Sequence, residues 1–229
     1  MKCLQNLKRV KKELHPDQMN DILDKCIYAS IMNAVMSGAY PSLSEEIAWD
    51  GNNYLFQNME GIRGVIAFSN DIFVCGVRNE KKYEEGRENI FFKLLNSASV
   101  KVLKLAEEEL LPYFLVESEN GNIPALSMIF WGENDMILSC VNEAEVMERS
   151  EFSLLPYVYN FNDLEKYWID CYEPNEEQLV LVNQIFQKRL VCNNFRLSNN
   201  QKEKLINWFG DNVEYCEERF NEIGIGVPD

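Results

Sequence analysis

The stretch that decides the fold is NYLFQNMEGIRGVIAFSNDIFVCGVR, residues 53–78. It holds three short runs rich in aromatic and β-branched residues: Asn53–Gln57, Ile62–Phe68 and Ile72–Arg78. Turn-forming residues separate the runs, at Met59-Glu60-Gly61 and at Asn70-Asp71. Runs of this kind, broken by turn residues, are typical of antiparallel hairpins. The stretch therefore predicts a three-stranded meander.

The Asn70-Asp71 turn also predicts the register of the second hairpin. A two-residue turn there places Phe68 opposite Phe73 and Arg63 opposite Arg78. Because side chains alternate across a strand, the faces divide into an apolar core face and a face of small residues that carries both arginines. Opposed like charges destabilise a hairpin unless a carboxylate or an anionic ligand lies between them.

The opposed arginines have two interpretations. In the first, a carboxylate of the chain itself separates them, and acidic residues outnumber basic ones 37 to 22. The candidates for it are Asp50, Glu60 and Glu80. In the second, the arginines bind an anion or a partner beside a tryptophan in a polar turn, a residue type that often dominates interfaces. The ligand- or partner-binding residues predicted in that case are Trp49, Asp50, Arg63 and Arg78.

A second stretch, residues 113–141, repeats this pattern. Strands are predicted over Tyr113–Glu117, Ile123–Trp131 and Met136–Val141. Each stretch begins with Tyr and two apolar residues, turns at a Gly and closes on a strand that contains one Cys. The similarity is compatible with an internal duplication and equally with the general sequence pattern of β-meanders.

Apolar residues three and four positions apart predict helices before, between and after the meanders. The predicted N-terminal helices are Met1–Leu14, which is basic, and Asp17–Met36; Glu88–Asn96 and Ser99–Leu111 lie between the meanders. The last third carries capping boxes at Asn162/Glu165 and Ser198/Gln201, a helix from Asn175 to Val191, and a stop at Gly224.

The predicted fold class is therefore α+β. An antiparallel sheet built from two three-stranded meanders packs with helices, and the C-terminal third is helical. No Gly-, Ser- or Pro-rich linker interrupts the chain, which predicts a single compact domain over residues 1–229. The alternative is an α+β part over residues 1–159 and a helical part over 160–229.

The charge of the chain restricts its partners. The formal net charge is -15 and the pI is about 4.6. Nucleic acid is excluded as the main partner, because duplex binding depends on Lys and Arg contacts to phosphates. An anionic membrane surface is disfavoured for the same reason, and no apolar run approaches the ~18 residues that span a bilayer. A solvated acidic surface explains such a charge, and a basic protein is the partner that it would attract.

The cysteines and the single histidine restrict the compartment and the chemistry. Seven cysteines are scattered without a Cys-x-x-Cys pair, so neither a disulfide framework nor a metal site is expected. Reduced thiols and the lack of an apolar signal segment predict a cytoplasmic location, in a bacterium. His15 is the one histidine, and it precedes Pro16, which disfavours histidine-based catalysis. No phosphate-binding loop or other cofactor motif is present, so no cofactor is expected.

These features favour a non-catalytic protein-binding module of the bacterial cytoplasm, an immunity- or antitoxin-like neutraliser of a basic partner. A ligand-binding domain or enzyme that recognises a small anion through Arg63 and Arg78 is the alternative. A third hypothesis is a homo-oligomer formed through the broad apolar stripe of the Asp17–Met36 helix. The basic Met1–Leu14 helix is expected to dock on the protein's own acidic body.

Overall fold

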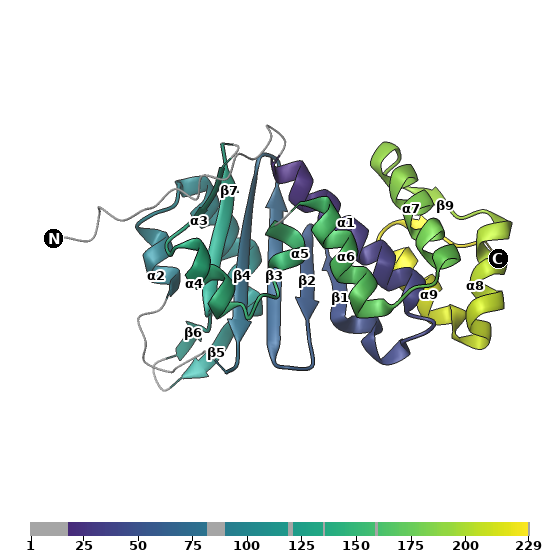
Figure 1. The fold of residues 1–229 in the computed structure, drawn as a ribbon. Coiled ribbons are helices and arrows are strands. Elements are labelled where there is room, and N and C mark those ends of the chain that lie inside the picture. The colour runs from purple at the N-terminus through teal and green to yellow at the C-terminus, as the bar shows by residue number, and fades with distance from the viewer. Residues whose placement is uncertain (1–17, 82–89, 119–120, 135, 159, 229) are drawn as a thin grey trace. The chain divides into compact units, whose positions relative to one another are not determined.

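A computed structural model describes residues 18–81, 90–118, 121–134, 136–158 and 160–228 (Figure 1). The fold is α+β, as predicted, with an antiparallel sheet of six strands and with helices gathered in the C-terminal third. The predicted helix Met1–Leu14, with His15, lies outside the described residues.

Contacts along the chain define two compact units. The first comprises Asp50–Leu155 together with residues up to Asp21, and the second comprises Ile22–Trp49 together with Pro156–Asp229. The second unit is therefore built from two segments that are far apart in the sequence. The single domain over residues 1–229, and its alternative, a division near residue 159, both stay predictions.

The strand order in the main sheet is β1 (Ile47–Asp50), β2 (Asn53–Gln57), β3 (Ile62–Ser69), β4 (Ile72–Asn79), β7 (Met128–Glu133), β8 (Met136–Ser139). The meander β2–β3–β4 is confirmed, and so is its register, with Phe68 opposite Phe73 and Arg63 opposite Arg78. Strand β1 was not predicted, because the sequence pattern at Trp49-Asp50 indicates a turn.

The second predicted meander divides between two sheets. Strands β5 (Leu115–Ser118) and β6 (Gly121–Pro124) pair with each other in a separate sheet of two strands. Strands β7 and β8 pair antiparallel and extend the main sheet beyond β4. The predicted single strand Ile123–Trp131 breaks after Pro124, which has no amide hydrogen to continue a ladder. The two stretches are thus not equivalent in three dimensions.

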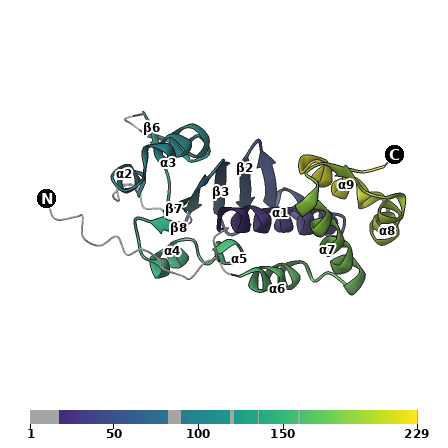
Figure 2. The same cartoon turned by 90° about the horizontal axis from the view of Figure 1, so that it is seen from above.

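Both faces of the central strands are buried. The predicted core face is confirmed by Ile66, Phe68 and Phe73, which are at most 8% exposed. The other face, predicted to carry small residues and both arginines, is also covered over most of its length. The elements that cover it are α2 (Ile90–Leu95), α3 (Val100–Leu105) and a π-helical turn, η2 (Ala106–Leu110) (Figure 2).

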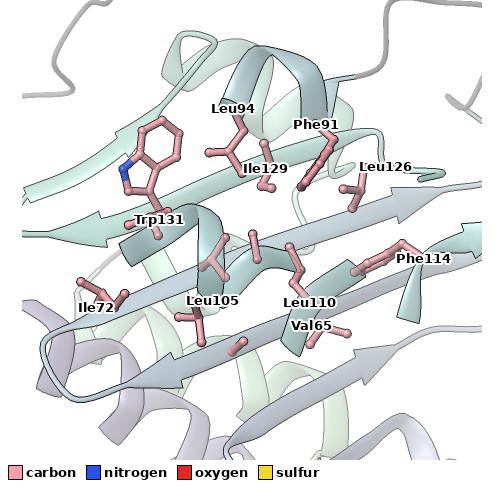
Figure 3. Packing of buried hydrophobic residues seen from close by; sticks show 14 residues of the cluster. Val65, Ile72, Phe91, Leu94, Leu105, Leu110, Phe114, Leu126, Ile129 and Trp131 are labelled. Atoms are coloured by element: carbon pink, nitrogen blue, oxygen red, sulfur yellow. The ribbon is translucent and has the colours of Figure 1, made fainter. Parts of the chain in front are cut away.

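We call this buried cluster the helix-covered core (Figure 3). Its members are all at most 8% exposed: Val65, Ala67, Ile72, Val74, Phe91, Leu94, Val102, Leu105, Ala106, Leu110, Phe114, Leu126, Ile129 and Trp131. The small side chains on this face of the strands admit the close approach of helices. The short 3-10 helix η3 (Leu111–Tyr113) follows η2, and α4 (Glu143–Arg149) follows β8.

The second unit is mainly helical. Its helices are α1 (Gln18–Met36, of which the unit takes the part from Ile22), the 3-10 helix η1 (Pro41–Glu46), α5 (Leu155–Val158), α6 (Phe161–Tyr172), α7 (Glu176–Val191), α8 (Asn199–Phe209), the 3-10 helix η4 (Gly210–Asn212) and α9 (Val213–Glu222). The short strands β9 (Phe195–Arg196) and β10 (Ile225–Gly226) pair in parallel. Tyr28 of α1 packs edge-on against Phe161 and Phe186, at centroid distances of 5.0 and 5.2 Å.

Helix boundaries follow the predicted capping signals with one exception. The capping box of Ser198 and Gln201 is present, and Gly224 follows α9 with a φ of 73°. The predicted box at Asn162 is wrong, since α6 begins earlier and the Asn160 side chain accepts from the amide of Asp163. Asn is a favourable N-cap residue, so N-cap preference alone does not separate Asn160 from Asn162.

The apolar stripe of α1, which was expected to form a contact between copies, is already buried. Its residues from Ile22 to Met36 include Cys26, Ile31 and Val35, each 0% exposed. The stripe would have to be uncovered before it could contact a second copy.

Candidate functional site

The arginines of the predicted site share one carboxylate. Glu80 Oε1 lies 3.1 Å from Arg63 Nη2 and 3.3 Å from Arg78 Nη2. Glu80 follows β4 and was one of the three carboxylates considered for this role. The contact relieves the repulsion between the opposed guanidinium groups without any ligand.

Asp50 lies apart from the arginines. Asn53 pairs with Ala67, whereas Gln57 pairs with Arg63, so the residues around Asn53 are at the opposite end of the β2–β3 hairpin. Four residues of strand span about 13 Å. Asp50, which precedes Asn53 in the chain, therefore does not share a site with Arg63.

Trp49 belongs to the second unit, where its indole has a packing role. Its Nε1 donates to Ser30 Oγ at 2.8 Å, and the side chain is half-buried. The four predicted residues therefore do not form one site. Arg63 and Arg78 share Glu80, Trp49 donates a hydrogen bond to Ser30, and Asp50 lies apart from the arginines.

Asp50 takes part in a different cluster, which we call the Tyr113 cluster: Asp50, Asn53, Glu109 and Tyr113. The Tyr113 hydroxyl donates to Asp50 Oδ2 at 2.6 Å. The Asn53 amide nitrogen donates to Glu109 Oε2 at 3.1 Å and to the Tyr113 oxygen at 3.3 Å. Asn53 is 4% exposed, while Asp50 and Glu109 are exposed. A buried amide and a phenol thus hold two surface carboxylates in fixed positions.

The π-helical turn η2 supplies Glu109, one of the two carboxylates of this cluster. Ala106 and Leu110, at its ends, are both 0% exposed and belong to the helix-covered core. Between them Glu107, Glu108 and Glu109 are all exposed. Single π turns occur often at functional sites, because the wide turn changes the direction of its side chains. Of these three acidic side chains, Glu109 is the one that joins the Tyr113 cluster.

The surroundings of Tyr113 favour its protonated form. Partial burial raises the pKa of the phenol, and the hydrogen bond to Asp50 raises it further, as do the charges of Asp50 and Glu109; the Asn53 donor opposes the shift. Because the pKa in the folded state exceeds that of the unfolded chain, the stabilisation is present at neutral pH. It is lost as pH rises through the folded pKa. At neutral pH the phenol is a hydrogen-bond donor.

Asp50→Asn is expected to lower the pKa of Tyr113 towards its ordinary value. The substitution removes both the carboxylate acceptor and its charge, which are two of the causes of the shift. An ultraviolet titration of the phenolate measures the change, with Tyr113→Phe used to identify the signal of this tyrosine. A Tyr113 titration that is the same in the Asp50→Asn variant and the wild type would contradict the observed hydrogen bond.

The described part of the chain offers no metal centre. Within it, no group of three or more His, Cys, Asp or Glu side chains is arranged to hold an ion. Among the same residues, no helix has both the length and the apolar character needed to cross a bilayer. No disulfide joins the described cysteines, and burial raises the pKa of Cys75 well above its usual range.

No protein-family model, curated protein or solved structure matches this chain. The residues of the site are therefore the evidence for function. Of the Tyr113 cluster only Asp50 was predicted. The acidic run at 107–109 has the pattern of solvated surface, and Asn53 that of an ordinary strand residue.

Proposed function

We propose that the protein is a non-catalytic protein-binding module of the bacterial cytoplasm. It neutralises a basic protein partner in the manner of an immunity protein or antitoxin. The observation that carries the proposal is the Tyr113 cluster, in which hydrogen bonds hold exposed carboxylates in place on a chain of net charge -15.

Preorganisation supports the use of this cluster in binding. A free carboxylate side chain loses rotamer entropy when it is immobilised at an interface. Asp50 and Glu109 are already restrained by Tyr113 and Asn53, so less of that cost remains on binding. Their unused oxygen lone pairs can accept hydrogen bonds from a lysine or an arginine of the partner.

Electrostatics supports a basic partner in particular. Glu107 and Glu108, which precede Glu109 in η2, are also exposed, and Glu108 lies 3.8 Å from Lys104 in an exposed pair. A chain of net charge -15 accelerates encounter with a positively charged protein. Carboxylates at such a surface can form ion pairs with the Lys and Arg side chains by which a nucleic-acid-binding protein contacts phosphates. Blocking a partner in this way requires no catalytic group.

The alternative function, recognition of a small anion by Arg63 and Arg78, has less support. Glu80 already contacts both guanidinium groups, and a ligand would have to displace it. No other observation favours that alternative over the binding module.

Charge reversal at the cluster is expected to weaken binding of the basic partner. The full chain is immobilised at low salt, the basic proteins that it retains are eluted with salt, and each is purified for binding titrations. Affinity should fall about tenfold or more in Glu107→Lys and in Asp50→Lys, and should fall for the wild type as salt rises. Glu107 makes none of the hydrogen bonds that hold the cluster together. Its variant therefore tests the effect of charge without breaking the cluster.

Glu177→Lys is the matched control, because it makes the same charge change at an exposed position in the first turn of α7. It should leave the affinity within about threefold of the wild type. Retention of no basic protein, or equal affinity for the wild type and for the Glu107→Lys and Asp50→Lys variants, would overturn the proposal.

A further inference from the structure

Four aromatic rings of the second unit lie in a row. The Tyr167 and Trp168 centroids are 5.0 Å apart with planes at 90°, and the Trp168 and Tyr172 centroids are 5.8 Å apart with planes at 20°. Tyr40, which precedes η1, places a fourth ring 6.1 Å from that of Tyr172. Trp168 and Tyr172 are at most 8% exposed, whereas Tyr40 and Tyr167 are half-buried. We call these residues the aromatic row; its middle is buried and its two ends reach the surface.

One carboxylate lies beside the aromatic row. Glu46, the last residue of η1, is half-buried. Burial raises the pKa of Tyr167 and of Tyr172, and the charge of Glu46 contributes to both shifts. Partial burial likewise raises the pKa of the exposed Cys171, again with a contribution from Glu46. The Glu46 carboxylate therefore lies near both hydroxyls and the thiol.

This carboxylate has no cation beside it. No described lysine or arginine forms an ion pair with Glu46, and no described residue donates a hydrogen bond to it. Glu222 is the contrast, because burial raises its pKa too, but its Oε1 lies 3.0 Å from Arg219 Nη2. Burial of a charge is costly unless an opposite charge compensates for it. Burial raises the pKa of Glu46 without that compensation, which a cationic ligand would supply.

The hydrogen bonds of the neighbouring hydroxyls narrow the kind of cation. The Tyr172 hydroxyl accepts from Asn33 Nδ2 at 2.9 Å, and the Tyr167 hydroxyl is hydrogen-bonded to Cys171. Glu46 thus remains as the acceptor without a donor. A primary ammonium ion has three N–H donors to satisfy. A quaternary ammonium ion has none, and it needs only an opposite charge and aromatic surface.

We propose that Glu46 and the aromatic row bind the quaternary ammonium group of a small molecule. Glu46 compensates the positive charge, and the half-buried rings of Tyr40 and Tyr167 contribute cation–π attraction. Asn33, which is 2% exposed, holds Tyr172 in place, so the row is ordered before a ligand arrives. The site lies wholly within the second unit and shares no residue with the Tyr113 cluster. The inference is therefore independent of the basic protein partner.

The Cys171 thiol tests the proposal, because the charge of Glu46 contributes to its raised pKa. The rate at which iodoacetamide alkylates Cys171 in the full chain is measured against pH, by mass spectrometry of the peptide that contains it. The salts compared are tetramethylammonium chloride and potassium chloride at equal concentration. Tetramethylammonium bound at Glu46 offsets the carboxylate charge, so the midpoint of the profile should fall by about half a pH unit relative to potassium. A ligand that merely shields the thiol lowers the rate but not the midpoint.

Glu46→Gln should itself lower the midpoint and should abolish the difference between the two salts. Glu177→Gln is the matched control, because it removes the same charge at an exposed position in the first turn of α7, and it should keep the wild-type difference. Circular dichroism establishes that each variant is folded. Equal midpoints in the two salts for the wild type, or a difference that persists in Glu46→Gln, would overturn the proposal.

Discussion

Trp131→Ala lowers the free energy of unfolding by about 3–5 kcal/mol, the largest loss expected for a single side chain of this protein. Trp131 lies on β7 in the helix-covered core and is 1% exposed (Figure 3). Its removal loses the transfer free energy of the ring and leaves a cavity that the surrounding strands and helices fill only in part. Urea unfolding measures the effect as a lower midpoint at nearly constant slope.

Trp131→Phe is the informative control. The buried indole nitrogen has no hydrogen-bond partner among the described residues, and an unpaired buried donor costs about 1–3 kcal/mol. Phenylalanine retains much of the apolar area and removes that donor. The expected loss is therefore only about 1 kcal/mol. Equal losses for Phe and Ala would show that the indole nitrogen has a partner that stabilises it.

Gly76→Val destabilises the fold by about 2–3 kcal/mol, because the helix-covered core has no room for the new side chain. A Cβ at residue 76 would lie 2.8 Å from Leu126 Cδ2 and 3.1 Å from both Leu110 Cδ2 and Phe114 Cε2. Three side chains would have to move together, and each is at most 5% exposed. Thermal or urea unfolding of the variant measures the loss.

Gly51→Asn is the matched control for this substitution. Gly51 has a φ of 60°, and a Cβ there would meet nothing within 4 Å. Asparagine tolerates left-handed backbone better than most residues. The expected change is within about 0.5 kcal/mol. A loss as large as that of Gly76→Val would mean that packing does not explain the glycine at 76.

Local sequence was sufficient for the meander and its register. Asn70 adopts a φ of 40°, as the tight turn requires, and the alternation of side chains then determines which residues oppose each other. The sequence did not determine what covers the face that holds Val65 and Ala67. Small side chains are common both on open sheets and beneath closely packed helices, and the pattern within one strand does not distinguish the two.

The Tyr113 cluster was not predictable in this way. Tyr113 and Asp50 are 63 positions apart, and Asn53 and Glu109 are 56 apart. Their contact depends on how η2 and η3 pack against the sheet, which no short-range spacing specifies. The ion pairing of Glu80 with the two arginines could be anticipated from the sequence. Glu80 was one of three candidate carboxylates, and it follows Arg78 by two positions in the chain.

The divided second unit has a consequence for biosynthesis. Helix α1 leaves the ribosome early, yet the aromatic residues that enclose Tyr28 belong to α6 and α7. The roughly 100 residues of the first unit that are made in between occupy about 5–20 s of translation. During that interval Tyr28 has neither Phe161 nor Phe186 to pack against. A nascent chain stalled within the first unit should therefore recruit chaperones to α1, and should release them once α7 has emerged.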